Sequence, residues 1–141
     1  PYTQERFSGG LGRAEWTGPN RKGPLRTTAT TRLADATLYS TFPEIGSDAQ
    51  RAAFQNVVKD VKLTRYGCDC YAYALLAIGQ IDLVIEAGLN AYDIQGPIAV
   101  IEAGGGVVTD WDGNPAHNGG TALAAATPDF HAAAMAKTKE V

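Results

Sequence analysis

The sequence has no lysine or arginine between residues 67 and 136, although this stretch carries eight acidic side chains. The eight are Asp69, Asp82, Glu86, Asp93, Glu102, Asp110, Asp112 and Asp129. Residues 1–66 hold ten Lys and Arg against six acids, and the whole chain has a net charge of −3. Nucleic acids and anionic membranes attract proteins with clustered cations. The lack of a basic surplus therefore argues against both as partners.

Cysteine is also scarce, with Cys68 and Cys70 as the only two. They are too few and too close for a disulfide framework, and their C-x-C spacing differs from the C-x-x-C of redox motifs. We interpret them as reduced thiols, which predicts a cytoplasmic protein. No apolar run approaches the roughly 20 residues that a membrane span needs. The chain starts at Pro1 without a secretory signal pattern, and we expect it to begin inside a longer protein.

The residues that are present favour a mixed α/β fold. Apolar residues make up 45% of the 141 positions, enough to bury a core for one domain or half of a larger one. Strands are predicted at residues 4–8, 12–17, 36–42, 63–66, 81–86, 107–110 and 122–126, with a turn-rich loop over 18–24. Helices are predicted after Ser47, over 69–78 and 93–103, and after Thr127. This alternation predicts a layered sheet with helices on both faces.

The uncompensated acids leave two interpretations open. About half are expected to cap helices and close turns, and two or three could instead face a bound metal ion. Glu86 ends a buried strand and Asp93 begins a helix seven residues later. Ligands of open α/β sheets collect beyond the carboxyl ends of strands, and Mg²⁺ prefers oxygen ligands. An Asp at a helix start is also the ordinary N-cap, so the spacing fits both interpretations.

Three segments of the sequence carry motifs of one known family. Residues 93–110, DIQGPIAVIEAGGGVVTD, resemble the C-terminal signature of the inositol monophosphatase-like phosphatases. Residues 63–86, which include RYGCDCYAY, resemble most closely the histidinol-phosphate phosphatase branch, as does the opening PYTQERF with Gly9 and Gly10 after it. The resemblance spans nearly the whole chain, but it covers only about the C-terminal half of the family's length.

The resemblance implies how the chain is organised. Residues 1–42 are expected to form the closing strands of an N-terminal antiparallel sheet and a connection, and residues 43–141 the C-terminal α/β sub-domain. The family's Glu-Glu segment and its D-P-x-D-G-T motif, which hold the other metal ligands, do not occur in this sequence. We therefore expect no catalytic residue in this chain, negligible turnover by it alone, and the N-terminal half of the same protein as a partner. A homodimer is also expected.

The resemblance also implies a function, the Mg²⁺-dependent hydrolysis of a small-molecule phosphate monoester. Asp93 matches a metal ligand, whereas Glu86, Asp69 and Asn90 match residues on the substrate side of the site. Paired carboxylates suit a cationic amino group, since charge-assisted hydrogen bonds are the stronger kind. This favours histidinol phosphate, and hence histidine biosynthesis. The alternatives are an inositol, sugar or nucleotide phosphate, or a non-catalytic interaction domain whose acids are only structural.

The remaining candidates are expected to be structural. His117 is predicted at the surface, and His131 is predicted to be solvated or half-buried. Glu102 is interpreted as a buried, hydrogen-bonded acid. Asp110 and Asp112 are expected to shape a turn after a strand.

Overall fold

The computed structural model describes residues 2–140, in which the chain forms two separate β-sheets. The first sheet is antiparallel, with β1 (Arg6–Gly10), β2 (Arg13–Thr17) and β3 (Lys22–Pro24) in that order. The second has the order β5-β4-β6-β8-β7. Its strands are β4 (Thr37–Ser40), β5 (Leu63–Tyr66), β6 (Leu83–Leu89), β7 (Val107–Thr109) and β8 (Gly120–Ala125). β4 runs parallel to β5 and β6, whereas β8 is antiparallel to β6 and β7.

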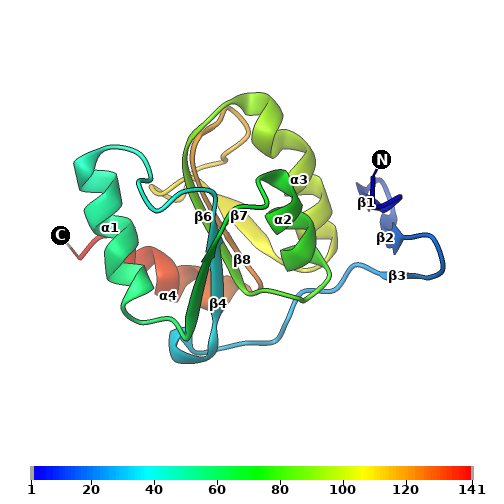
Figure 1. Ribbon diagram of the computed structural model, residues 1–141, viewed down its shortest axis with the longest axis horizontal. Coiled ribbons are helices and arrows are strands. Elements are labelled where there is room, and N and C mark those ends of the chain that lie inside the picture. The colour runs from blue at the N-terminus through cyan, green and yellow to red at the C-terminus, as the bar shows by residue number, and fades with distance from the viewer. Residues whose placement is uncertain (1, 141) are drawn as a thin grey trace.

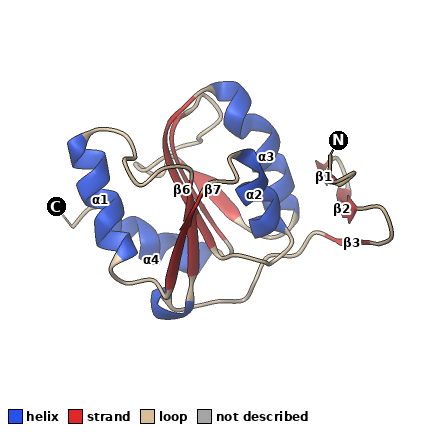
Figure 2. Cartoon of the chain, viewed as in Figure 1, coloured by secondary structure: helices blue, strands red, loops and turns tan. Residues whose placement is uncertain are grey.

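Helices cover both faces of the five-stranded sheet (Figures 1 and 2). One face carries α1 (Asp48–Val58) and α4 (Pro128–Thr138), and the other carries α2 (Cys70–Ala77) and α3 (Ala91–Ala103). The three-stranded sheet packs outside α3 through β1. A short 3-10 helix, Leu33–Asp35, precedes β4. The expected fold, with covered sheet faces and a preceding antiparallel sheet, is confirmed. The chain passes from the first sheet to the second between β3 and β4, which is upstream of the boundary expected after residue 42.

The alternation of side chains along β6 decides which residues reach the functional side of the sheet. Leu83 and Ile85 are fully buried in the core beneath α1 and α4. Val84 points the other way, into the core beneath α2 and α3. Because successive strand residues face opposite sides, Glu86 lies on the same side as Val84. The carboxylate is thereby directed toward the two helices that begin nearby.

Local capping signals are confirmed, whereas some boundaries differ. Ser47 caps α1 in a capping box with Gln50, and Thr127 caps α4 by accepting from the Phe130 amide. The loop predicted over 18–24 contains β3, which pairs with β2. Gly23 permits this pairing, because a Cβ there would lie 2.9 Å from Trp16 Nε1. The close approach of the Trp16 side chain to Gly23 cannot be predicted from the local sequence pattern.

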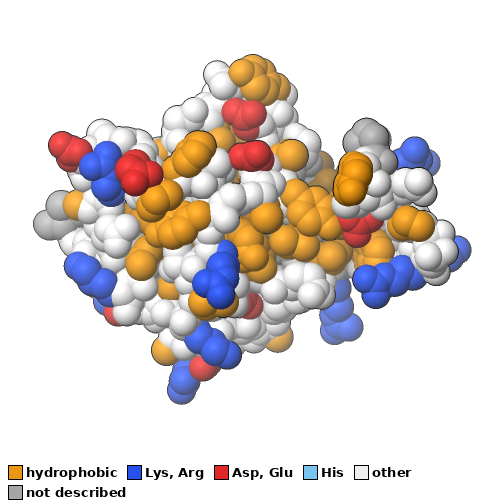
Figure 3. Space-filling view, viewed as in Figure 1, with side chains coloured by type: hydrophobic (Ala, Val, Ile, Leu, Met, Phe, Trp, Pro, Cys, Tyr) orange, Lys and Arg blue, Asp and Glu red, His pale blue; other side chains and the backbone are white. Residues whose placement is uncertain are grey.

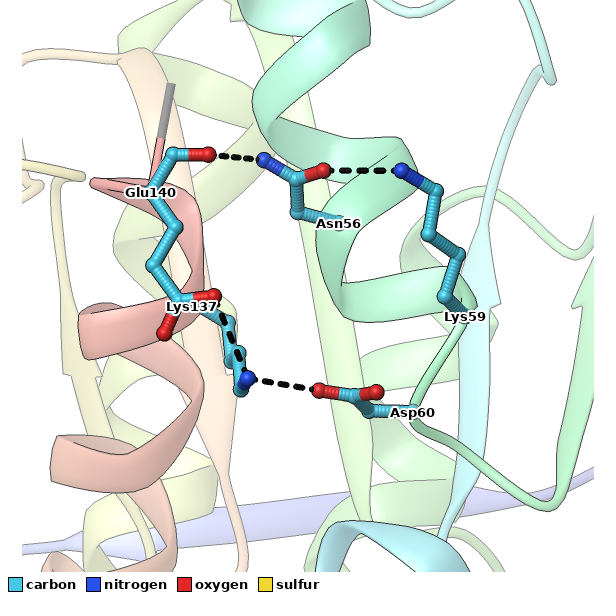
Figure 4. A network of polar contacts seen from close by, with 5 residues as sticks. All are labelled: Asn56, Lys59, Asp60, Lys137 and Glu140. Atoms are coloured by element: carbon cyan, nitrogen blue, oxygen red, sulfur yellow. Dashed lines mark hydrogen bonds and ion pairs between the residues drawn. The ribbon is translucent and has the colours of Figure 1, made fainter.

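A polar network joins the C-terminal ends of α1 and α4 (Figure 4). Lys137 forms ion pairs with Asp60 at 2.9 Å and with Glu140 at 3.1 Å. Asn56 donates to the Glu140 carbonyl and accepts from Lys59 Nζ at 3.1 Å. These partners are largely exposed, and exposed ion pairs contribute little each. The network therefore ties the helices together without being the main source of their stability.

Two further expectations concern membranes and thiols. Across residues 2–140, no helix combines the length and the apolar character needed to cross a lipid bilayer. Cys68 and Cys70 are both free and both exposed. They lie at the turn into α2, next to the site described below.

Candidate functional site

An acidic cavity lies where the parallel strands end and two helices begin. β5 leads through a short turn into α2, and β6 leads into α3, so both helix N-termini meet beyond the carboxyl ends of the strands. The cavity has a volume of about 300 Å³. Its lining consists of Thr41, Phe42, Asp69, Cys70, Tyr73, Glu86, Ala87, Gly88, Leu89 and Asp93. It contains three carboxylates and no basic residue, and we call it the acidic cavity.

Glu86 forms the floor of the acidic cavity. It is only 5% exposed, and its Oε1 accepts hydrogen bonds from the Thr41 amide at 2.8 Å and the Thr41 hydroxyl at 2.7 Å. Burial raises the pKa of Glu86 above its ordinary value, the bonds from Thr41 lower it, and the negative charge of Asp69 raises it. The net direction is upward. A cation in the cavity would stabilise the charged form that burial disfavours.

The raised pKa of Glu86 predicts a pH-dependent cost to folding. The unfolded state releases this proton near the ordinary pKa of 4.5, whereas the folded state retains it to higher pH. Stability is therefore lost as the pH rises above 4.5 through the folded pKa. We expect Glu86→Gln to stabilise the ligand-free protein at pH 7 and to have little effect near pH 4, measured by urea unfolding. Glu44→Gln, at an exposed carboxylate, is the control. A Glu86→Gln effect that is equal at both pH values would contradict this origin.

Asp69 reaches the cavity because of an unusual turn. Gly67, Cys68 and Asp69 have φ values of 100°, 72° and 44°, and left-handed backbone is uncommon for residues with a Cβ. Asp69 is the N-cap residue of α2, yet its side chain makes no capping hydrogen bond. The exposed carboxylate instead lines the acidic cavity. Strained backbone of this kind is found preferentially at binding sites, where the surrounding structure maintains it.

Asp93 lines the same cavity from the first turn of α3. The helix begins at Ala91 with Asn90 as its N-cap, so the expectation that Asp93 begins the helix is wrong by two residues. Asp93 Oδ2 accepts from the Asn90 amide at 2.7 Å. One oxygen thus stabilises the helix terminus, and Oδ1 makes no hydrogen bond to residues 2–140. The capping and ligand interpretations of Asp93 are compatible, because each uses a different oxygen.

Asn90 itself is exposed and does not line the acidic cavity. Its backbone holds Asp93 in place, as described above. A direct contact between its side chain and substrate stays a prediction.

The donor set suits a hard cation but does not complete a metal site. Within residues 2–140, no three His, Cys, Asp or Glu side chains cluster closely enough to hold a metal ion. Carboxylate oxygen is the ligand type that Mg²⁺ prefers, and Asp93 Oδ1 has no competing partner in the described chain. In Figure 3, acidic side chains over the N-terminal ends of α2 and α3 stand apart from the Lys and Arg side chains. The residues present therefore fit one ligand of a metal ion, and further ligands would have to come from outside the described residues.

Other acids serve the fold. Asp82 is 7% exposed and accepts from the Thr28 hydroxyl at 2.6 Å and the Thr37 amide at 2.8 Å. Asp110 accepts from the backbone amides of Asp112 and Asn114 at 2.9 and 2.7 Å, which confirms the expected turn. The structure thus divides the acids between fold and cavity, as the two interpretations allowed.

Two expectations outside the cavity are corrected. Glu102 is exposed rather than buried, because it lies on the outer face of α3. His131 is buried at 9% exposure, and its Nε2 lies 2.9 Å from Thr109 Oγ1. Burial lowers the pKa of His131. His117 is exposed, as expected.

Thr41 and Tyr73 are the two polar residues of the cavity that the sequence analysis did not assign to a site. Thr41 follows β4 and supplies both hydrogen bonds to Glu86. Tyr73 lies within the helix predicted over 69–78, four residues after Asp69. Residues at that spacing share a helix face, so the spacing was an available signal.

Comparisons with known proteins agree with this geometry. The sequence model of the inositol monophosphatase family matches residues 1–141. The chain is 45% identical over 113 residues to the chloroplastic bifunctional phosphatase IMPL2 of Arabidopsis thaliana, which covers 80% of this chain and 32% of that protein. It is 28% identical over 101 residues to the histidinol-phosphatase of Streptomyces coelicolor, which covers 71% of this chain and 38% of that protein. The chain thus spans about a third of the length of these curated relatives.

The fold is also similar to a solved structure. An inositol monophosphatase from Zymomonas mobilis superposes with a TM-score of 0.88 at 28% identity. The superposition covers 96% of this chain and 53% of that protein. The fold and the resemblance expected from the sequence are confirmed.

Proposed function

Because the chain belongs to the inositol monophosphatase family, we propose that it is the C-terminal part of a Mg²⁺-dependent phosphatase acting on histidinol phosphate. The observation that carries this proposal is the acidic cavity, which is lined by three carboxylates and by no basic residue. Such a cavity favours a substrate with a cationic amino group over a neutral polyol. The Streptomyces coelicolor relative, named a histidinol-phosphatase, supports the same substrate.

Each carboxylate has a distinct task in this proposal. Asp93 Oδ1 would hold one metal ion, while Oδ2 keeps the start of α3 in place. When bound, Mg²⁺ supplies charge stabilisation and a more acidic water for the hydrolysis of a phosphate monoester. Asp69 and Glu86 bind the ammonium group and so orient the organic part of the substrate. Thr41 maintains the orientation of Glu86 through its two hydrogen bonds.

An inositol phosphate is the second candidate substrate. The observation that favours it is the similarity to the Zymomonas mobilis inositol monophosphatase, at the same 28% identity as the histidinol-phosphatase. Asp69 distinguishes the two candidates, because a neutral polyol has no charge to pair with a second acid. The non-catalytic alternative predicts no hydrolysis of either compound.

Exchange of Asp69 for asparagine tests the substrate. Asn has nearly the same shape as Asp, so it strains the φ of 44° at this position no more than Asp69 does, and the turn is expected to survive. In the longer protein, we expect Asp69→Asn to lower kcat/KM for histidinol phosphate by roughly 10- to 100-fold, since a charge-assisted bond is lost. Inositol phosphate turnover should change much less, and Asp112→Asn, at an exposed turn, should change neither. Equal losses on both substrates would contradict amine recognition.

The remaining expectations concern assembly and location. We propose that the N-terminal part of the longer protein supplies the missing metal ligands. The 141-residue chain alone should therefore show negligible phosphatase activity, and adding that part should restore it. The homodimer and the cytoplasmic location stay predictions, to be checked by light scattering and cell fractionation.

A further inference from the structure

One buried polar group beside the acidic cavity has no hydrogen-bond partner among the described residues. Tyr73 is only 2% exposed, and its hydroxyl is buried without a hydrogen-bond partner among the described residues. Buried hydroxyls in native proteins are nearly always paired, because an unpaired one costs free energy. An orphaned hydroxyl in a cavity wall therefore indicates a group that is paired only when the cavity is filled.

Tyr73 lies close to the carboxylates of the acidic cavity. The residue lies one turn into α2, and it lines both the acidic cavity and a second cavity of about 690 Å³ between β1, α2 and α3. Burial raises the pKa of Tyr73, and the negative charges of Glu86 and Asp93 raise it further. The hydroxyl therefore keeps its proton at neutral pH.

A protonated phenol beside carboxylates has a defined hydrogen-bonding capacity. It can donate its proton to an anionic oxygen, and its lone pairs remain free to accept from an N–H donor. An ammonium group carries three donors, of which Asp69 and Glu86 do not occupy all. A third acceptor within the same wall would satisfy the remaining donor, which a water molecule would otherwise have to reach.

We propose that Tyr73 is a specificity-determining residue whose hydroxyl hydrogen-bonds the amino alcohol part of the bound substrate, together with Asp69 and Glu86. This inference rests on the proposed function and deepens it. The hydroxyl is retained in the ligand-free protein at a cost to stability, and ligand binding provides its partner.

Removal of the hydroxyl alone separates binding from folding. In the longer protein, Tyr73→Phe should weaken the binding of histidinol, measured calorimetrically, by roughly 10- to 100-fold. The same variant should leave the Tm of the ligand-free protein unchanged or raise it, because a buried unpaired group is removed. Tyr71→Phe is the matched control, since the Tyr71 hydroxyl donates to Glu5 Oε2 at 2.7 Å outside the acidic cavity. It should lower Tm and leave histidinol binding unchanged.

Each outcome decides between the hypotheses. Weaker histidinol binding with an unchanged or higher Tm supports the role of Tyr73. Unchanged binding in Tyr73→Phe, when the wild type binds histidinol, overturns this inference alone. A clear fall in the Tm of ligand-free Tyr73→Phe also overturns it, because the hydroxyl would then be structural. A wild-type protein that neither binds histidinol nor hydrolyses its phosphate overturns the proposed function and this inference with it.

Discussion

Replacement of Asp93 by asparagine is expected to reduce the kcat of the proposed longer phosphatase by at least about 100-fold while the fold stays intact. Mutation of residues that only hydrogen-bond to a metal ligand already lowers metal affinity or activity by roughly 10- to 100-fold. Mutation of the ligand itself should lower activity by more. The fold should survive because an asparagine carbonyl can still accept from the Asn90 amide, as Asp93 Oδ2 does at 2.7 Å. The loss should therefore come from the charge on Oδ1.

Two measurements separate this charge from the helix cap. Calorimetric titration with Mg²⁺ should show weaker binding for Asp93→Asn, whereas urea unfolding without metal should match the wild type. Asp93→Ala removes both oxygens and should in addition lose about 1 kcal/mol of stability, the usual cost of a lost cap. Wild-type activity and Mg²⁺ affinity in Asp93→Asn would exclude Asp93 as a metal ligand.

Gly9→Ala is expected to cause a large loss of stability for a single added methyl group. β1 packs against α3 so closely that a Cβ on Gly9 would lie 2.5 Å from Val100 Cα, with the Ala99 backbone equally obstructive. Backbone atoms cannot rotate away, so the three-stranded sheet must move from the helix. Overpacking of this kind costs about 1–3 kcal/mol, and more where backbone must shift.

The control for Gly9→Ala lies on the helix itself. A Cβ on Gly96 of α3 meets nothing within 4 Å. Gly96→Ala should therefore lose much less stability than Gly9→Ala, although Pro97 follows and offsets the gain in helix propensity, because proline disfavours helical backbone at a preceding residue with a Cβ. Urea unfolding of both variants measures the difference. Wild-type stability in Gly9→Ala would show that the close packing of β1 on α3 does not contribute to the folded state.

Local chemistry made several elements predictable. Ser47 with Gln50, and Thr127 with Pro128, mark helix starts because side-chain oxygens near an N-terminus satisfy free backbone amides. Glu86 and Asp93 could be assigned to one site because a strand end and the next helix start meet at one sheet edge. These features depend on a few neighbouring residues, so they can be read without the rest of the fold.

Long-range packing decided the features that could not be predicted. β3 depends on Gly23 lying against Trp16, and the buried His131 of α4 contacts Thr109 at the end of β7. Thr41 can hydrogen-bond to Glu86 only because β4 and β6 are neighbours in the sheet. Along the chain, these two strands are separated by α1, β5 and α2. No spacing rule along the chain contains these pairings.

The sequence by itself determined the types of secondary structure, the family, and the choice of Asp69, Glu86 and Asp93 as site residues, which line one cavity. Periodicity, capping residues and motif spacing are local properties, and they suffice for those conclusions. Only the tertiary structure showed that Asp93 divides its two oxygens between helix and cavity, and that the hydroxyl of Tyr73 is left without a partner. The physical reason is that hydrogen-bond satisfaction depends on which atoms meet in space, and the chain must fold before those atoms are neighbours.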